Sequence, residues 1–147
     1  MSSLQGYLAL GGRLLLSAIF LLSGSGKIMD WSGTAAHMRA EGMPLVPLLL
    51  VGAILFELVG GFSLLFAWKP KLGAWLLFLY LIPTTLIFHD FWAFGGAERM
   101  NQMIHFLKNL TIMGGLLIVA SIPEREIKVR SGERVFDRNR FDRRRAA

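Results

Sequence analysis

The stretch LVPLLLVGAILFELVGGFSLLFAW, Leu45–Trp68, decides the fold of this chain, and its only charged side chain is Glu57. A hydrocarbon core about 30 Å thick needs roughly 20 helical residues to cross it. Unpaired backbone groups cannot face lipid, so a segment of this kind forms a helix and not an isolated strand. The sequence therefore predicts a membrane-spanning helix at this position.

Three further apolar stretches of similar length accompany it, at Tyr7–Gly26, Leu72–Phe88 and Met103–Ile122. Each is long enough to cross a bilayer as a helix. The predicted fold class is all-α, an integral membrane four-helix bundle. A cleaved signal peptide is an alternative for the first stretch, but no Lys or Arg precedes Arg13 and three more spans follow, which favours a retained span.

The connections between spans differ in character. Trp31–Met43 predicts a short helix at the membrane interface, capped by Ser32 and ended by Gly42 with Pro44. The segment from His89 to Gln102 predicts a looser connection.

The overall composition agrees with lipid as the solvent. Hydrophobic residues make up 54% of the 147 residues and charged residues only 18%, whereas soluble domains carry about 25% charged residues. This composition excludes a disordered chain and argues against a soluble enzyme. Because the chain has no cysteine, a redox role would need a bound cofactor or a partner protein.

The positive net charge of +6 is concentrated near the end of the chain. Residues 1–122 form the predicted four-span domain, and residues 123–147 form a predicted basic cytoplasmic tail that holds nine of the 16 basic residues. Basic residues favour the cytoplasmic side, and eleven lie on the side of the termini against three on the other side. We therefore expect both termini in the cytoplasm, the tail near anionic lipids, and no nucleic-acid partner.

Charged groups inside a predicted span are costly and call for an explanation. Glu57 falls near the middle of the second span, and Arg13 lies about 9 Å inside the first. An Arg13–Glu57 ion pair is therefore expected. Its role stays open between fixing the packing of the first two helices and serving function.

A second polar group is expected at the outer ends of the spans. His105, Lys108 and Asn109 share one helix face because of their spacing. With Glu57 beneath, they predict a polar pocket open to the periplasmic side, together with other polar residues at the same level. The further candidates are Lys27, His89 and Asp90.

The alternative for this outer group is that the lysines extend to the interface, which we favour for Lys27 considered alone, and that each histidine is an interfacial residue. No metal site is expected, because the three histidines are spread along the chain at His37, His89 and His105. Gly60-Gly61 and Gly114-Gly115 indicate close helix packing and no function of their own.

Six motifs in this order resemble the DoxX family of small four-helix membrane proteins. They are Gly12-Arg13 followed by Phe20, Ser23-Gly24-Ser25-Gly26-Lys27, Gly42-Met43-Pro44, Glu57-x-x-Gly60-Gly61, His89-x-Phe91-Trp92, and His105-Phe106-Leu107-Lys108-Asn109 leading into Gly114-Gly115. The resemblance implies a bacterial inner-membrane protein related to the membrane subunit of thiosulfate:quinone oxidoreductases. Some members are similar to membrane anchors of complexes with superoxide dismutase and a sulfur-transfer enzyme.

The resemblance and the polar residues together predict a membrane component of an oxidoreductase or oxidative-stress system, with a quinone as the expected cofactor in the pocket. Two alternatives stay open: a non-catalytic scaffold or anchor subunit, and a small proton-coupled transporter built around Glu57. The expected partners are membrane lipids, an oxidoreductase, superoxide dismutase or sulfurtransferase subunit, and a second copy of the chain.

Overall fold

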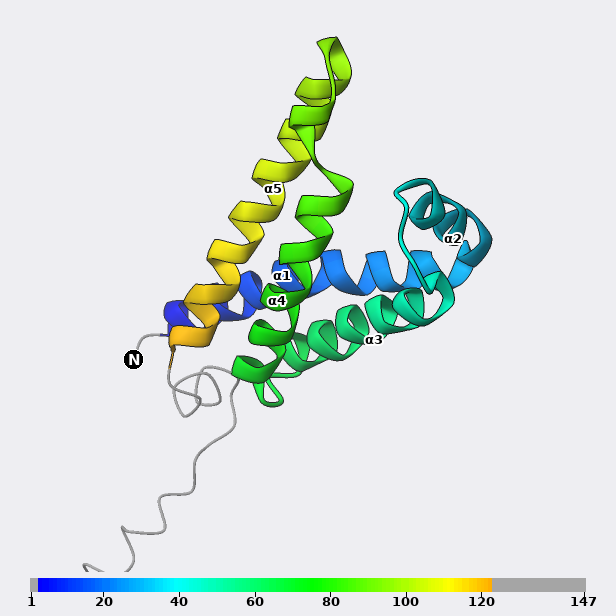
Figure 1. Cartoon of the computed structure of the whole chain (residues 1–147). Helices are drawn as coiled ribbons and strands as arrows, with labels where there is room; N and C mark the ends of the chain where they lie inside the picture. Colours follow the sequence, from blue (N-terminus) through cyan, green and yellow to red (C-terminus); the bar gives the residue numbers. More distant parts are fainter. Residues whose placement is uncertain (1–2, 123–147) are drawn as a thin grey trace, which may run out of the picture.

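The computed structural model describes residues 3–122, and within that range every regular element is a helix (Figure 1). The elements are α1 (Ser3–Met29), α2 (Trp31–Ala40), α3 (Val46–Leu65), α4 (Pro70–Phe88), the 3₁₀ helix η1 (Phe91–Ala93) and α5 (Gly96–Ser121). Four helical segments in this range are long and apolar enough to cross a membrane: α1, α3, α4 continued to Ala93, and α5. The all-helical fold class and the four spans are therefore confirmed.

The four long helices form two antiparallel pairs, α1 with α3 and α4 with α5, and α3 also packs against α4. Figure 1 shows the two pairs meeting near the start of α1 and the α3–α4 turn, and diverging from there. We call this meeting point the turn end. The opposite end of the α1–α3 pair carries α2, and we call it the α2 end.

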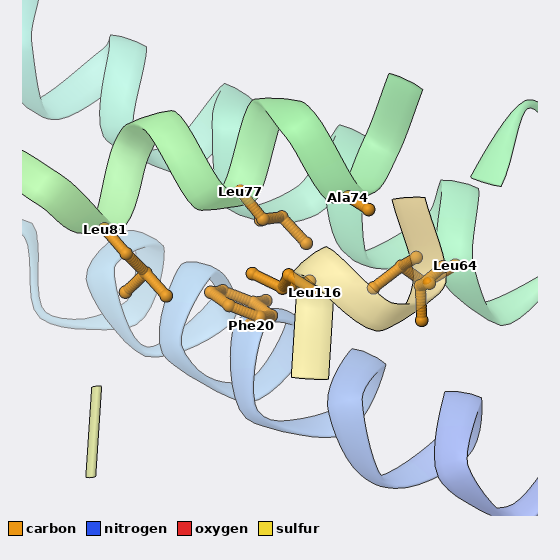
Figure 2. Close-up of a cluster of buried hydrophobic side chains, with 7 residues drawn as sticks. Phe20, Leu64, Ala74, Leu77, Leu81 and Leu116 are labelled. Carbon is orange, nitrogen blue, oxygen red and sulfur yellow. The ribbon is translucent and has the colours of Figure 1, made fainter. Parts of the chain in front are cut away.

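The packed core lies where the two pairs meet (Figure 2). Its buried side chains come from all four long helices and are Phe20, Leu64, Ala74, Leu77, Leu81, Leu116 and Val119. Glycines let the backbones approach: a Cβ on Gly60 would collide with the Leu77 side chain, and one on Gly61 would lie 2.8 Å from Leu21. The packing role expected for Gly60 and Gly61 is thus confirmed. Gly115 also packs closely, with a would-be Cβ 3.2 Å from Leu16, but the same expectation for Gly114 is wrong, because nothing lies within 4 Å of its would-be Cβ.

The short helix α2 forms near its expected position, but its cap differs from the prediction. Asp30, not Ser32, is the N-cap, and its carboxylate accepts a hydrogen bond from the Gly33 backbone N–H at 3.0 Å. The helix buries Ala35 and Met38 against α3 in a second apolar cluster. This packing holds α2 against the end of the bundle.

The connection from α4 to α5 is more ordered than the sequence suggested. The fourth span begins at Gly96, well before Met103, and Gly96 has a positive φ of 58°. The preceding η1 turn places Phe91 and Trp92 edge-on to Phe106, with ring centroids 5.3 and 6.0 Å away. The expected loose segment therefore contains a 3₁₀ turn and two turns of α5.

The outer faces of the long helices are apolar. Leu15 is 78% exposed, Leu48 67% and Ile118 65%, and many other large apolar side chains are exposed with them. A soluble domain rarely exposes so much contiguous apolar surface. These faces contact membrane lipids in a chain whose four long helices can span the bilayer.

Candidate functional site

Glu57 is buried near the middle of α3 and is held by three side chains. Lys27 Nζ lies 2.9 Å from both of its carboxylate oxygens, so the two residues form a salt bridge. Ser23 Oγ donates to Glu57 Oε1 at 2.9 Å, and the Tyr80 hydroxyl donates to the same oxygen at 3.0 Å. Glu57 is only 3% exposed, so this charge is compensated by side chains and not by water.

The antiparallel packing of α1 and α3 explains these partners. Gly24 of α1 lies against Leu58, with a would-be Cβ only 2.9 Å from that side chain. Ser23 and Lys27 are one helical turn apart and so share a face of α1. Lys27 Nζ also donates to Ser23 Oγ at 2.6 Å, which completes a connected cluster around the carboxylate.

The expected Arg13–Glu57 pair is wrong, because Glu57 pairs with Lys27. Arg13 lies opposite the last turn of α3, where its Nη2 donates to the Leu65 carbonyl oxygen at 3.5 Å. Leu65 is eight residues beyond Glu57, a rise of about 12 Å along a helix. Lys27, which was expected to extend to the interface, instead turns inward.

A second polar contact joins α4 and α5. Asn109 Nδ2 donates to Thr85 Oγ1 at 3.1 Å, and both side chains are buried. Apolar surroundings strengthen such a bond and make its loss expensive. Asn109 is thus a packing contact as well as a candidate binding residue.

The two histidines near the far end of the α4–α5 pair stack on each other, with ring centroids 5.2 Å apart and planes inclined by 19°. His89 Nδ1 lies 3.0 Å from Gln102 Oε1, and His105 Nδ1 lies 3.0 Å from Lys108 Nζ. Asp90 is half-buried and stands at the N-cap of η1, with no side-chain cap bond in this turn.

These groups surround a cavity of about 1410 Å³ between the diverging helix pairs and α2. Most of its wall is apolar, from residues such as Ile19, Phe56 and Ile87. Five of the expected site residues line it: Lys27, Glu57, His89, Lys108 and Asn109. His105 joins the group through Lys108 and His89, whereas Arg13 lies at the turn end.

Sequence reasoning did not assign a role to Ser23, Tyr80 or His37, which also line the cavity. Tyr80 is one of two tyrosines in the chain and a polar group within an apolar span, which was an available signal. His37 belongs to α2, and its ring centroid lies 5.2 Å from that of Phe88. Among residues 3–122, no group of three or more His, Asp or Glu side chains is arranged to hold a metal ion.

The site thus combines apolar walls with a few fixed polar groups, an arrangement that proteins use to bind small molecules. The Lys27–Glu57 pair has no net charge, and Asn109 and Lys108 carry N–H donors beyond those that Thr85 and His105 accept. The arrangement is suited to an amphiphile with an uncharged, hydrogen-bonding head.

The four spans and this internal polar cluster define the chain as a small multi-pass membrane protein. The chain belongs to the DoxX family, whose model matches residues 8–90. It is similar to the inner membrane protein YqjF of Escherichia coli strain K12, with 36% identity over 120 residues, covering 82% of this chain and 87% of YqjF.

A second inner membrane protein of the same organism, YphA, is 29% identical over 113 residues, covering 77% of this chain and 81% of YphA. The ER-derived vesicles protein ERV29 of Saccharomyces cerevisiae is 24% identical over 132 residues, which are 90% of this chain and 36% of ERV29. No solved structure matches the chain. The inner-membrane relatives and the four apolar helices identify a multi-pass inner-membrane protein.

Proposed function

We propose that the protein binds a lipid-soluble molecule of the quinone class in the cavity between its helix pairs, as the membrane component of an oxidoreductase or oxidative-stress system. The observation that carries this proposal is the buried Glu57 carboxylate, held by Lys27, Ser23 and Tyr80 in the wall of a mostly apolar cavity. Polar groups at this depth are expensive and commonly mark functional sites.

The shape and chemistry of the cavity support a quinone-like ligand. Drug-sized ligand pockets measure about 300–1,000 Å³, so a cavity of about 1410 Å³ has room for a ring and part of an apolar tail. Lys108 and Asn109 each keep an N–H beyond the one directed at His105 or Thr85, and such donors suit the oxygens of a quinone ring. The apolar walls suit its substituents and its isoprenoid tail.

The charge balance of the site argues against proton-coupled transport. A carboxylate that carries protons across a membrane must lose its charge during the cycle. Glu57 contacts the Lys27 ammonium through both oxygens, so a proton carrier at this position would have to give up that salt bridge in every cycle. The scaffold alternative differs from our proposal in predicting no retained ligand.

We also propose that both termini face the cytoplasm. The distribution of basic residues supports this orientation, which directs the α2 end toward the periplasm. A partner oxidoreductase, superoxide dismutase or sulfurtransferase subunit would then complete the electron path, because this chain has no thiol of its own. A second copy of the chain is a further proposed partner. Residues 123–147, the proposed basic tail, lie outside the described part of the structure.

The test is the lipid-soluble content of the purified protein. We expect mass spectrometry of the wild type, extracted directly into lipid nanodiscs, to detect a retained quinone at a level above that of empty nanodiscs. Tyr80→Phe should lower the retained amount, because it removes the hydroxyl that holds Glu57 in the cavity wall and keeps the ring.

Tyr7→Phe is the matched control, since Tyr7 is 72% exposed on α1, and it should retain as much quinone as the wild type. Retention no greater than in empty nanodiscs would contradict the proposal and favour the scaffold alternative.

A further inference from the structure

The hydrogen bonds around His89 determine which of its ring nitrogens carries the proton. Gln102 Nε2 donates to the Glu98 carboxylate at 2.8 Å. An ionised carboxylate only accepts, so this contact fixes the orientation of the Gln102 amide and turns its oxygen toward His89. Because an amide oxygen also only accepts, the 3.0 Å contact requires a proton on His89 Nδ1. In the neutral ring, Nε2 is then an acceptor.

His105 is fixed in the opposite way. Its Nδ1 lies 3.0 Å from Lys108 Nζ, and an ammonium only donates. Nδ1 of His105 must therefore be the acceptor, and its proton lies on Nε2 in the neutral ring. The two stacked rings are thus held as opposite tautomers by two separate contacts, one from Gln102 and one from Lys108.

We propose that Glu98 and Gln102 hold His89 as a hydrogen-bond acceptor toward the cavity, so that the cavity selects a ligand head that donates a hydroxyl, a hydroquinone over the corresponding quinone. His89 lines the cavity beside Lys108 and Asn109, and with Nδ1 engaged, Nε2 is the nitrogen that remains for a ligand. This inference rests on the proposed function. In it, Glu98 and Gln102 are positioning residues that need not touch the ligand.

The selectivity follows from the chemistry of the two redox forms. A hydroquinone hydroxyl donates to Nε2, whereas a quinone carbonyl can only accept, so it would face an acceptor and leave it unsatisfied. A site built to accept from a hydroxyl discriminates against an analogue that lacks one. The other ligand oxygen can accept from Lys108 in either redox form.

The first experiment reads the tautomers without any ligand. The full-length protein is labelled with ¹⁵N-histidine, placed in nanodiscs at about pH 8, where neutral imidazole prevails for histidine in general, and studied by NMR. We expect Nδ1–H for His89 and Nε2–H for His105. Gln102→Leu, and the milder Glu98→Gln, should each give His89 a mixture of tautomers, while the exposed neighbour Asn101→Leu should leave its spectrum unchanged. A wild-type His89 with its proton on Nε2, or a spectrum insensitive to Gln102→Leu, would overturn the inference.

The second experiment measures the affinity of a short-chain benzoquinone and of its hydroquinone. One hydrogen bond contributes about 0.5–1.5 kcal/mol, so Gln102→Leu should weaken hydroquinone binding by a factor of about 2 to 13. Quinone binding should change less than about twofold, and Asn101→Leu should affect neither. Equal weakening of both forms would contradict the selectivity. If the wild type bound neither form, the proposed function itself would be refuted. The tautomer spectra are recorded without a ligand, so they test the arrangement of His89 independently of that result.

Discussion

Lys27 bridges both carboxylate oxygens of Glu57 at 2.9 Å and so ties α1 to the middle of α3. The two side chains differ in exposure, at 21% for Lys27 and 4% for Glu57. The pair therefore sits at the boundary between the cavity and the interior, with the carboxylate on the buried side. The two opposite charges cancel, so the site is polar but carries no net charge. In this it differs from a membrane site that holds a single carboxylate.

The coupling between these residues can be measured with a double-mutant cycle. Glu57→Leu leaves the ammonium without its counterion and should lower the free energy of unfolding by about 3 kcal/mol. Lys27→Met should cost at least as much, because Glu57 is the more buried partner. The double variant should lose less than the sum of the two single losses, since both charges are gone, but it should stay below the wild type because the Ser23 and Tyr80 hydroxyls lose their acceptor.

Unfolding in mixed detergent micelles gives the four free energies. If the loss in the double variant equalled the sum of the two single losses, the residues would act independently. That result would contradict the salt bridge seen in the structure. Arg13→Met with Glu57→Leu is the comparison pair, and it should show little coupling because Arg13 contacts the end of α3.

Helix contact at the turn end depends on Gly60. A Cβ there would collide with Leu77, a fully buried core side chain. Gly60→Ala should therefore destabilise the protein by about 1–3 kcal/mol through overpacking. Gly52→Ala on the same helix meets open space and should be neutral or slightly stabilising, because alanine is the better helix former.

Thermal unfolding of both alanine variants in one detergent compares them directly. Equal stability of the two would mean that α3 and α4 do not approach as closely as the structure has it.

The spans were predictable from the sequence because a bilayer imposes length and hydrophobicity on each segment separately. The partner of Glu57 was not predictable, because it depends on the position of α1 relative to α3 along the helix axes. Depth alone placed Arg13 within reach of Glu57, whereas the observed register brings Ser23 and Lys27 to it. Gly24 sets that register through its close contact with Leu58.

Local chemistry explains the other differences. Asp30 and Ser32 are both good N-cap residues, and only the observed end of α1 at Met29 decides between them. The polar residues at the start of α5 led to the prediction of a loose connection there. In the structure, Gln102 and Glu98 form a hydrogen bond with each other within the helix. The face shared by His105, Lys108 and Asn109 followed from helical periodicity, yet only Lys108 and Asn109 line the cavity.

The buried bond between Asn109 and Thr85 should contribute to stability. Thr85→Val keeps the shape of the side chain and removes the oxygen that accepts from Asn109. An unsatisfied buried amide costs about 1–3 kcal/mol, and we expect a loss of that size in chemical unfolding. Thr111→Val is the control, since Thr111 is exposed on α5 and bonds only the Leu107 carbonyl of its own helix. A loss no larger than that of the control would contradict the contact.

The proposed orientation can be tested with single cysteines, because the chain has none of its own. Ala97→Cys, near the start of α5, should react with a membrane-impermeant maleimide on intact spheroplasts. Lys71→Cys, near the α3–α4 turn, should react only after the membrane is opened. The reverse pattern would place the termini in the periplasm.

Photoaffinity labelling can show whether the cavity beside Glu57 binds a lipid-soluble quinone. A photoreactive benzoquinone with an isoprenoid tail is added to membranes, and the labelled peptides are located by mass spectrometry. We expect labels in the segments that contain Lys27, Glu57 and Tyr80, and we expect them to disappear when excess unlabelled quinone is present. Labels confined to the lipid-facing surface around Leu15 and Ile118, and not displaced by excess quinone, would contradict it.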